Sequence, residues 1–235
     1  MYVPVSNHYT YIFLDIVTIV GPLFLSFDKK VAYYKYLRKF AISTFFTSLV
    51  YIIWDIIFTQ QGVWKFNQDY LIGLNIVNLP IEEYGFFTVV PYACIFIYMC
   101  LKIYFPKIAI PFNFTWSLIT LGSILLGIIY FDKIYTFITF GLIALTLTLM
   151  RTFASSFLKK YWSHFFISWV IAIIPMAYVN GVLTSKPVLI YNDLQNMGFR
   201  IGTIPFEDFF YNFLYMLWSI SIFELLLQKS QFDKK

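Results

Sequence analysis

Seven blocks of apolar residues with few charges limit what this chain can fold into. An α-helix of about 20 apolar residues crosses the hydrocarbon layer of a membrane, and the blocks are close to that length. We therefore predict an all-α integral membrane protein with seven transmembrane helices. The blocks cover residues 9–26, 36–58, 81–104, 113–131, 134–157, 161–184 and 205–228.

The supply of charged residues supports the same fold class. Only 12% of the 235 residues are charged, whereas soluble domains carry about 25%. So few charges could not cover a water-facing surface. The net charge of +5 could suggest a nucleic-acid partner, but the basic residues gather between the apolar blocks, where a positive-inside bias explains them better.

The basic residues divide unevenly between the two sides of the predicted membrane. Four lie on one side, at Lys65, Lys133, Lys186 and Arg200, and thirteen on the other. Cytoplasmic loops carry the excess of Lys and Arg, so we expect the N-terminus outside and the C-terminus in the cytoplasm, in a bacterial cytoplasmic membrane. The thirteen are Lys29, Lys30, Lys35, Arg38, Lys39, Lys102, Lys107, Arg151, Lys159, Lys160, Lys229, Lys234 and Lys235.

A pattern of residues recurs at a fixed spacing of 125. Matches at Asn, Gly, Pro and paired acids in a single register are hard to obtain by chance, so they indicate an internal duplication. Asp55 corresponds to Asn180 in the same register. The recurring elements are Phe66-Asn67, Gly73, Ile76 and Pro80-Ile81-Glu82-Glu83, which return as Tyr191-Asn192, Gly198, Ile201 and Pro205-Phe206-Glu207-Asp208.

The duplication predicts how the chain is divided. Residues 1–110 would form a first three-helix repeat, 111–133 a linker transmembrane helix, and 134–235 a second three-helix repeat. Four membrane crossings separate equivalent helices, so the two repeats should run parallel about an axis along the membrane normal. Both Pro-x-acid-acid motifs would then open their helices from the outer side, near the mouth of one central cavity.

The acidic pairs allow two interpretations. Pro and acids in a first helical turn are ordinary helix-start residues, because carboxylates favour the positive end of the helix dipole. However, acids at a membrane edge are costly and tend to mark functional sites, and capping needs only one acid. Two adjacent carboxyl groups in a poorly solvated site can hardly both ionise, so one can act as a general acid. We take Glu82, Glu83, Glu207 and Asp208 as candidate catalytic residues, and which member of the Glu82–Glu83 pair holds the proton stays open.

Aromatic and polar residues near the acids are candidates for substrate binding. An aromatic cavity suits a hydrocarbon, and the faces of aromatic rings can stabilise a carbocation. Packing is the alternative role for each aromatic ring, and Asp55 either orients the Glu pair or simply ends its helix. The candidates are Trp54, Asp55, Trp64, Phe66, Asn67, Phe86, Asn180, Tyr191, Asn192 and Tyr211.

The sequence gives no support for a metal or cofactor. His8 and His164 are isolated, so no metal site can be argued. No Gly-rich phosphate loop or dinucleotide fingerprint is present. We therefore expect a function that needs neither.

Several of these motifs together resemble the lycopene cyclase domain family, the membrane-integral carotenoid cyclases, in its fused, two-repeat, single-chain form. The resemblance covers nearly the whole chain, and Pro-x-Glu-Glu is the hallmark of the family. It carries over to Glu82 and Glu83 and, through the repeat, to Glu207 and Asp208. The stretches are Ser26-Phe27-Asp28-Lys29-Lys30, Trp54-Asp55-x-x-Phe58, Gly62-x-Trp64-x-Phe66-Asn67, Asn78-Leu79-Pro80-Ile81-Glu82-Glu83 and Pro91-Tyr92.

The resemblance implies an activity. An acid protonates a terminal double bond of lycopene, the neighbouring alkene attacks the cation, and a base removes a proton to leave a β-ionone ring. This isomerisation (an intramolecular lyase reaction) is non-redox. The implied partners are a lipid-soluble polyene, membrane lipids and other carotenoid-pathway enzymes. The second repeat departs from the pattern in having Asn180 for Asp55 and no counterpart of Trp54, which favours the first repeat as the catalytic half.

Other classes of protein share parts of this pattern. A small-solute transporter can have the same arrangement of three, one and three helices, but would line its cavity with polar groups and would not cluster acids at helix starts. A retinal protein would need a lysine in the last helix, and 209–227 has none. A prenyltransferase would need paired Asp-rich motifs, which Asn192-Asp193-Leu194-Gln195-Asn196 suggests only faintly. A hydratase that captures the same cation with water stays open.

Overall fold

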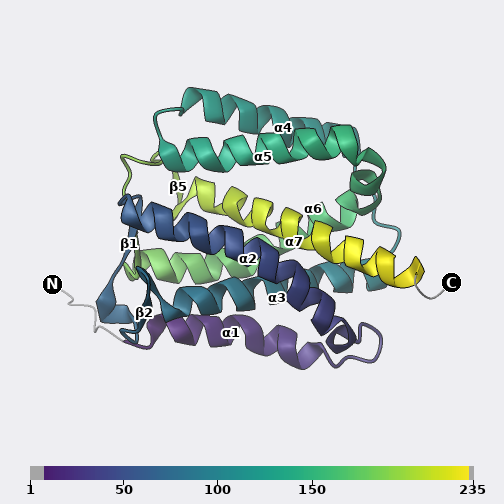
Figure 1. The fold of residues 1–235 in the computed structure, drawn as a ribbon, viewed down its shortest axis with the longest axis horizontal. Coiled ribbons are helices and arrows are strands. Elements are labelled where there is room, and N and C mark those ends of the chain that lie inside the picture. Colours follow the sequence, from purple (N-terminus) through teal and green to yellow (C-terminus); the bar gives the residue numbers. More distant parts are fainter. Residues whose placement is uncertain (1–7, 233–235) are drawn as a thin grey trace.

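The computed structural model describes residues 8–232, and its helices follow the apolar blocks closely. They are α1 (Thr10–Leu25), α2 (Leu37–Gln60), α3 (Ile81–Tyr104), α4 (Phe112–Ile129), α5 (Ile134–Phe153), α6 (Ser155–Ser185) and α7 (Phe206–Phe232), with short 3₁₀ turns at Tyr33–Tyr36 and Gln68–Tyr70. The helices lie roughly side by side, with α4 and α5 along one edge, α1 along the other, and the remaining four between them (Figure 1).

Six of these helices are long and apolar enough to cross a membrane. The exception is α1, which has 16 residues and would be about 24 Å long at 1.5 Å per residue, against a hydrocarbon core of about 30 Å. The seven predicted helices are all present in the described residues, and six of them have the length expected of a transmembrane helix.

The predicted boundary between the fifth and sixth helices is wrong. We expected helices over 134–157 and 161–184, with the break beside Lys159 and Lys160. The structure instead breaks at Ala154 (φ −136°, ψ 33°), and α6 runs for 31 residues from Ser155. Lysines are good helix formers and can extend their ammonium groups from a helix end to the membrane surface, so this pair does not interrupt the helix.

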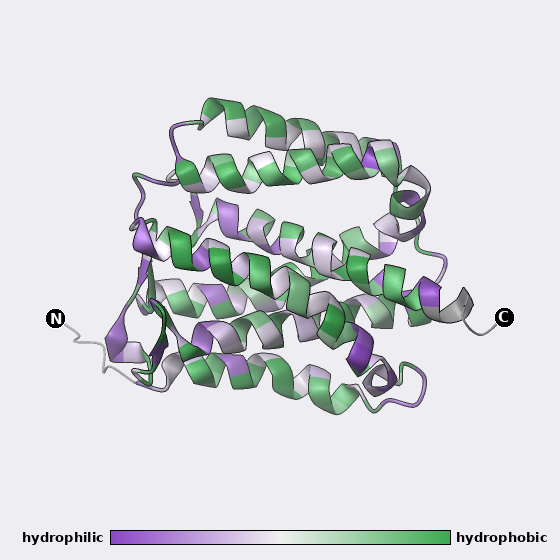
Figure 2. Cartoon of the chain, in the orientation of Figure 1, coloured by the Kyte–Doolittle hydropathy of each residue, from purple (hydrophilic) through white to green (hydrophobic). Residues whose placement is uncertain are grey.

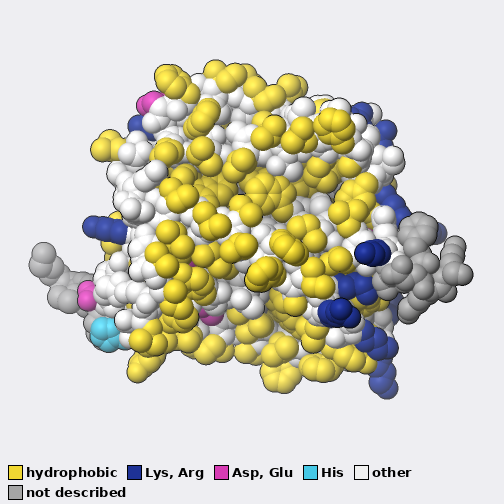
Figure 3. Space-filling model, viewed as in Figure 1, with side chains coloured by type: hydrophobic (Ala, Val, Ile, Leu, Met, Phe, Trp, Pro, Cys, Tyr) yellow, Lys and Arg dark blue, Asp and Glu magenta, His cyan; other side chains and the backbone are white. Residues whose placement is uncertain are grey.

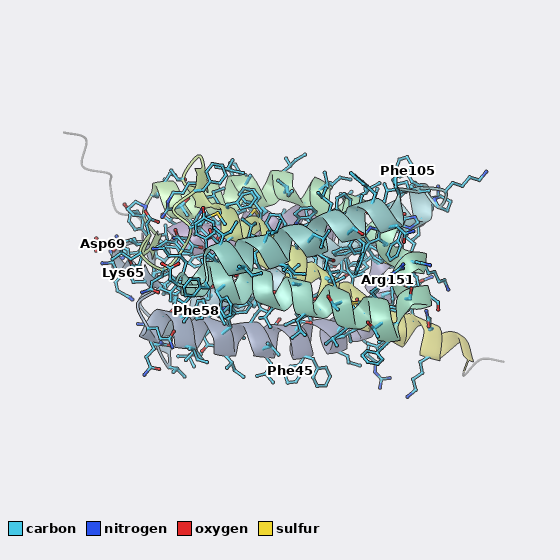
Figure 4. The ribbon with its side chains drawn as sticks, turned by 90° about the horizontal axis from the view of Figure 1, so that it is seen from above. Phe45, Phe58, Lys65, Asp69, Phe105 and Arg151 are labelled. Atoms are coloured by element: carbon cyan, nitrogen blue, oxygen red, sulfur yellow. The ribbon has the colours of Figure 1, made fainter. Side chains whose placement is uncertain are left out.

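The loops at one end of the bundle contain short strands that the sequence did not predict. They are β1 (Trp64–Phe66), β2 (Asn75–Ile76), β3 (Leu79–Pro80), β4 (Leu189–Tyr191), β5 (Arg200–Ile201) and β6 (Ile204–Pro205). We call this the strand end, made of residues 61–80, 130–133 and 186–205, and the opposite end the basic end. Lys65 and Asp69 lie at the strand end, and Phe105 and Arg151 lie at the basic end (Figure 4).

The surface matches a protein immersed in lipid between these two ends. Apolar residues run along the helices, whereas hydrophilic residues gather towards the ends (Figure 2). Large apolar side chains such as Phe45, which is 62% exposed, face outwards between the ends. On the face drawn in Figure 3, Lys and Arg side chains gather mainly at the basic end. Lys234 and Lys235, part of the predicted cytoplasmic charge, lie outside the described residues.

One hydrophobic core joins helices from both predicted repeats. In this core α2 packs against α7, and α6 packs against α3. The two halves of the chain therefore interlock, and the space between α3, α6 and α7 is enclosed by residues from both.

Candidate active site

The two long loops at the strand end follow the same backbone course. Gly73 and Gly198, 125 residues apart, have φ of 91° and 75°, and Val77 and Gly202, also 125 apart, have φ of 59° and 64°. Both loops fold into a two-residue hairpin, β2–β3 in one and β5–β6 in the other, with the same register after a shift of 125. The duplicated residues thus form duplicated turns.

Strands β1 and β4 connect the two loops. They pair antiparallel, with Lys65 opposite Ile190 at the centre and Trp64 opposite Tyr191 beside it. The central pair consists of residues that are 125 apart, so equivalent positions of the two loops meet each other. This pairing carries Trp64 and Tyr191 to the wall of the same cavity.

The first acid of each motif binds the backbone of its own loop. Glu82 Oε1 accepts the N–H of Ile72 at 2.7 Å, and Glu207 Oε1 accepts the N–H of Met197 at 2.8 Å. Glu207 Oε1 also accepts the hydroxyl of Thr136 at 2.5 Å. Both glutamates are buried, and neither lines the cavity. Their observed contacts hold the loops in place.

The second acid of each motif faces a cavity inside the bundle. Glu83 and Asp208 both line it, although they belong to different halves of the chain. The cavity has a volume of about 100 Å³, and its wall on α3 extends from Glu83 to Ile97, a distance of about 21 Å along a helix. It is therefore narrow and long, with carboxyl groups towards the strand end and mostly apolar walls below them.

Hydroxyl and amide groups hold the two cavity acids. Glu83 Oε2 accepts the Tyr11 hydroxyl at 2.5 Å. Asp208 accepts the Tyr135 hydroxyl at 2.7 Å on Oδ1, and on Oδ2 it accepts the Tyr191 hydroxyl at 2.8 Å and the Asn180 amide at 3.1 Å. Both acids thus have a tyrosine from the first turn of a helix, α1 or α5, as a partner.

Asp55 provides a further carboxyl group in the same cavity. It is buried in α2, lines the cavity beside Glu83, and interacts directly with it. Asn180, its counterpart 125 residues later, occupies the equivalent place beside Asp208. The two halves therefore differ in the group that lies next to the cavity acid.

The predicted substrate-binding residues divide into two groups. Trp54 packs against Tyr211, with 5.0 Å between the ring centroids, and does not line the cavity. Asn67 and Asn192 instead accept backbone N–H groups two residues later and shape the loops, and Phe66 lies in β1. The residues that do line the cavity are Asp55, Trp64, Phe86, Asn180, Tyr191 and Tyr211.

Sequence reasoning missed three side chains next to the acids. Tyr11 and Tyr135 could have been found, because each lies beside a threonine near the start of its helix, Thr10-Tyr11 in α1 and Tyr135-Thr136 in α5. The third is Asp15, buried in α1, whose carboxyl interacts electrostatically with Glu83.

The backbone of Gly85 makes room for Asp15. A Cβ atom at Gly85 would lie 3.0 Å from Asp15 Oδ2. In the second half the positions 125 residues later are Phe140 and Phe210, whose rings pack with 5.0 Å between their centroids. In the second half, a contact between two aromatic rings thus stands where the first half has a carboxyl group packed against a glycine.

Aromatic rings form much of the wall around the acids. The ring centroid of Trp64 lies 5.2 Å from that of Tyr135 and 5.8 Å from that of Tyr191. The rings of Tyr135 and Tyr191 are stacked at an interplanar angle of 14°. Burial, and then the Asp208 carboxylate, raises the pKa of Tyr191 well above its ordinary value, so its hydroxyl keeps its proton as a donor. Within residues 8–232 no group of three or more His, Cys, Asp or Glu side chains is arranged to hold a metal ion.

Comparison with known families agrees with this duplicated site. A family model described as lycopene cyclase matches the chain over residues 8–101 and again over 132–226. The two matches contain the two acidic motifs and leave out α4. No curated protein and no solved structure matches the chain. Since the matched residues make up most of the sequence, the chain belongs to the lycopene cyclase family.

Proposed function

We propose that this protein is a membrane-embedded lycopene β-cyclase, and that Glu83 and Asp208 transfer the protons. The observation that carries the proposal is that two carboxyl groups from different halves of the chain face one narrow, largely apolar cavity. A linear polyene dissolved in the bilayer suits such a cavity, with its end group against the acids and its chain along α3.

The proposed reaction needs a carboxylic acid, a carboxylate base and aromatic rings around the substrate. A carboxylic acid protonates the terminal alkene, which gives a tertiary cation. The neighbouring alkene attacks this cation and closes the ring, so the positive charge moves into the ring. A carboxylate then removes a ring proton, and a new double bond forms. Atoms are rearranged and no electrons are exchanged. Aromatic rings such as Trp64 and Tyr211 would stabilise the cation and keep water away from it.

We also propose that the halves are parallel repeats, 1–110 and 134–235, joined by a linker helix within 111–133. The central pairing of Lys65 with Ile190, and the equivalent contacts of α2 with α7 and α6 with α3, support a two-fold axis along the bundle. The strand end would then face outwards and the basic end the cytoplasm, as the distribution of Lys and Arg suggests.

Reporter fusions test this orientation. Reporters inserted after Lys65 and after Lys186 should both read as extracytoplasmic. If they read on opposite sides of the membrane, the parallel arrangement is wrong.

Pigment analysis tests the activity. Lycopene-accumulating cells that express the chain should form cyclised carotenoid. Glu83→Gln and Asp208→Asn each remove a titrating group at nearly constant size, so cyclisation per folded molecule should fall about 10²–10⁴-fold. Hydroxylated, uncyclised pigment from the wild-type protein would identify a hydratase instead. Unchanged lycopene in the presence of folded wild-type protein would refute both activities.

A further inference from the structure

The environment of Asp208 suits an ionised carboxylate. Its two oxygens accept three hydrogen bonds from neutral donors, the hydroxyls of Tyr135 and Tyr191 and the amide of Asn180. Hydrogen bonds donated to a carboxylate favour its charged form. Asp208 is therefore ready to accept a proton.

The environment of Glu83 is different. It accepts one hydroxyl, from Tyr11, and its other polar neighbours are carboxyl groups. Asp55 is in direct contact with it, and Glu82 and Asp15 interact with it electrostatically.

Asp55 Oδ2 is buried without a hydrogen bond among the described residues. The one donor beside the Asp55 carboxyl is the Trp64 indole N–H, which also has no hydrogen-bond partner among these residues. Two carboxylates in contact away from water repel each other, whereas one proton held between them forms a hydrogen bond. That proton would satisfy the unpaired oxygen.

The difference between the two sites comes from single substitutions between the repeats. Asp55 in the first half corresponds to Asn180 in the second, which exchanges a second carboxyl for an amide donor. Phe66 in the first half corresponds to Tyr191 in the second, which adds a hydroxyl donor. Both substitutions stabilise a carboxylate at Asp208, and neither does so at Glu83.

On the basis of the proposed function, we infer that the halves have opposite roles: the Glu83–Asp55 pair donates the proton and Asp208 accepts it. The O–H bond of the pair breaks as a C–H bond forms at the terminal alkene. After ring closure a C–H bond of the ring cation breaks, its electrons form the new double bond, and the proton goes to Asp208. Each turnover leaves the pair one proton short and Asp208 with one extra.

Tyr191 supplies a route for the return of that proton. Its hydroxyl bonds Asp208 and interacts electrostatically with Glu83 and Asp55. It can pass its own proton towards the pair and take the proton from Asp208, which restores both groups. Tyr191 is thus a positioning residue in this scheme, because it acts through the two acids.

Deuterium labelling separates the donor from the acceptor. Purified variants in lipid would be given unlabelled lycopene in D₂O, and the recovered lycopene examined by mass spectrometry. Asp208→Asn should still protonate the substrate. Its cation cannot be deprotonated in the ring, so it reverts, and the recovered lycopene gains deuterium. Glu83→Gln should return lycopene without label. Label in Glu83→Gln alone, in both variants or in neither would overturn the inference.

Asp55→Asn is a second test that does not depend on the folding of the Asp208 variant. The substitution installs the residue that the second half already has at Asn180, so the fold should accept it. It removes the shared proton, and cyclisation should fall about 10²–10⁴-fold with no label in recovered lycopene. A fall of less than tenfold would overturn the inference. Asp69→Asn, in an exposed loop, is the matched control and should behave as wild type.

These outcomes are distinct from a failure of the proposed function. If the wild-type protein forms no cyclised product, the activity itself is wrong. If it does form product but the labels appear in another pattern, only the assignment of donor and acceptor is wrong.

Discussion

The two halves agree in their loops and differ in their cavity side chains. Both loops have the same turns, the same hairpin register and a glutamate bonded to the N–H ten residues before it. Of the residues that line the cavity, Asp55 of the first half corresponds to Asn180 of the second. Beside the cavity, the first half has Asp15 against Gly85, whereas the second has the ring contact of Phe140 with Phe210. Loops of the same construction can thus place different side chains beside the two cavity acids.

The comparison also explains why one motif contains two acids. The first acid, Glu82 or Glu207, holds its loop, and the second, Glu83 or Asp208, faces the cavity. Successive residues of a helix point about 100° apart, so adjacent acids cannot face the same way. In each half, one acid thus binds the loop and the other faces the cavity.

The largest effect outside the carboxyl groups themselves is expected at Tyr191. Tyr191→Phe gives the second half the ring that Phe66 provides in the first, and it removes a hydrogen bond to a charged group, worth about 1.5–3 kcal/mol. Steady-state cyclisation should slow about 10–100-fold. The first turnover should slow less, because the returned proton is needed only afterwards. Rapid-quench measurements of both phases check this. Equal slowing of the two phases would point to substrate binding and would contradict a role in proton return.

The sequence predicted the long elements of this structure better than the short ones. Helices of 16 to 31 residues left long apolar runs, and all seven were predicted. Strands of two or three residues have no periodicity to detect, so β1–β6 were missed. The 125-residue repeat predicted that both acidic motifs open helices at one end of the bundle, as they do in Figure 1.

The site shows a second limit of sequence reasoning. The sequence could not show which of Glu82 and Glu83 faces the cavity. The direction of each side chain depends on the residue at which the helix begins, and the sequence does not fix that residue closely enough. Asp15 gave no signal, because a single acid in an apolar helix has no spacing to compare. Its importance appears only where Gly85 brings α3 close to it.

A smaller effect is expected when the first acids are removed. Glu82→Ala and Glu207→Ala each remove the acceptor of a partly buried backbone N–H, of Ile72 or Met197, and losing such a hydrogen bond costs about 0.5–1.5 kcal/mol. Glu207→Ala should lose more stability than Glu82→Ala, because Glu207 also accepts the Thr136 hydroxyl. Cyclisation per folded molecule should change only a few-fold in either variant. Thermal unfolding in detergent, with Asp69→Ala as control, measures the loss. Normal stability with abolished activity in either variant would make that acid a chemical group.

The smallest effect is expected at the turn position where a valine in the first loop and a glycine in the second share a left-handed conformation. Val77 is 76% exposed and has a left-handed φ of 59°, whereas its counterpart Gly202 has 64°. A left-handed conformation costs a residue with a Cβ about 1–2 kcal/mol, and glycine costs about 0.4–1 kcal/mol through the unfolded chain. Val77→Gly should therefore stabilise the protein by up to about 1 kcal/mol, and Gly202→Val should destabilise it by about the same amount. Thermal unfolding of the two variants measures both signs. If Val77→Gly destabilises the protein, the valine side chain makes a stabilising contact outside the described residues, for instance with lipid. The two loops would then be less alike than their backbones indicate.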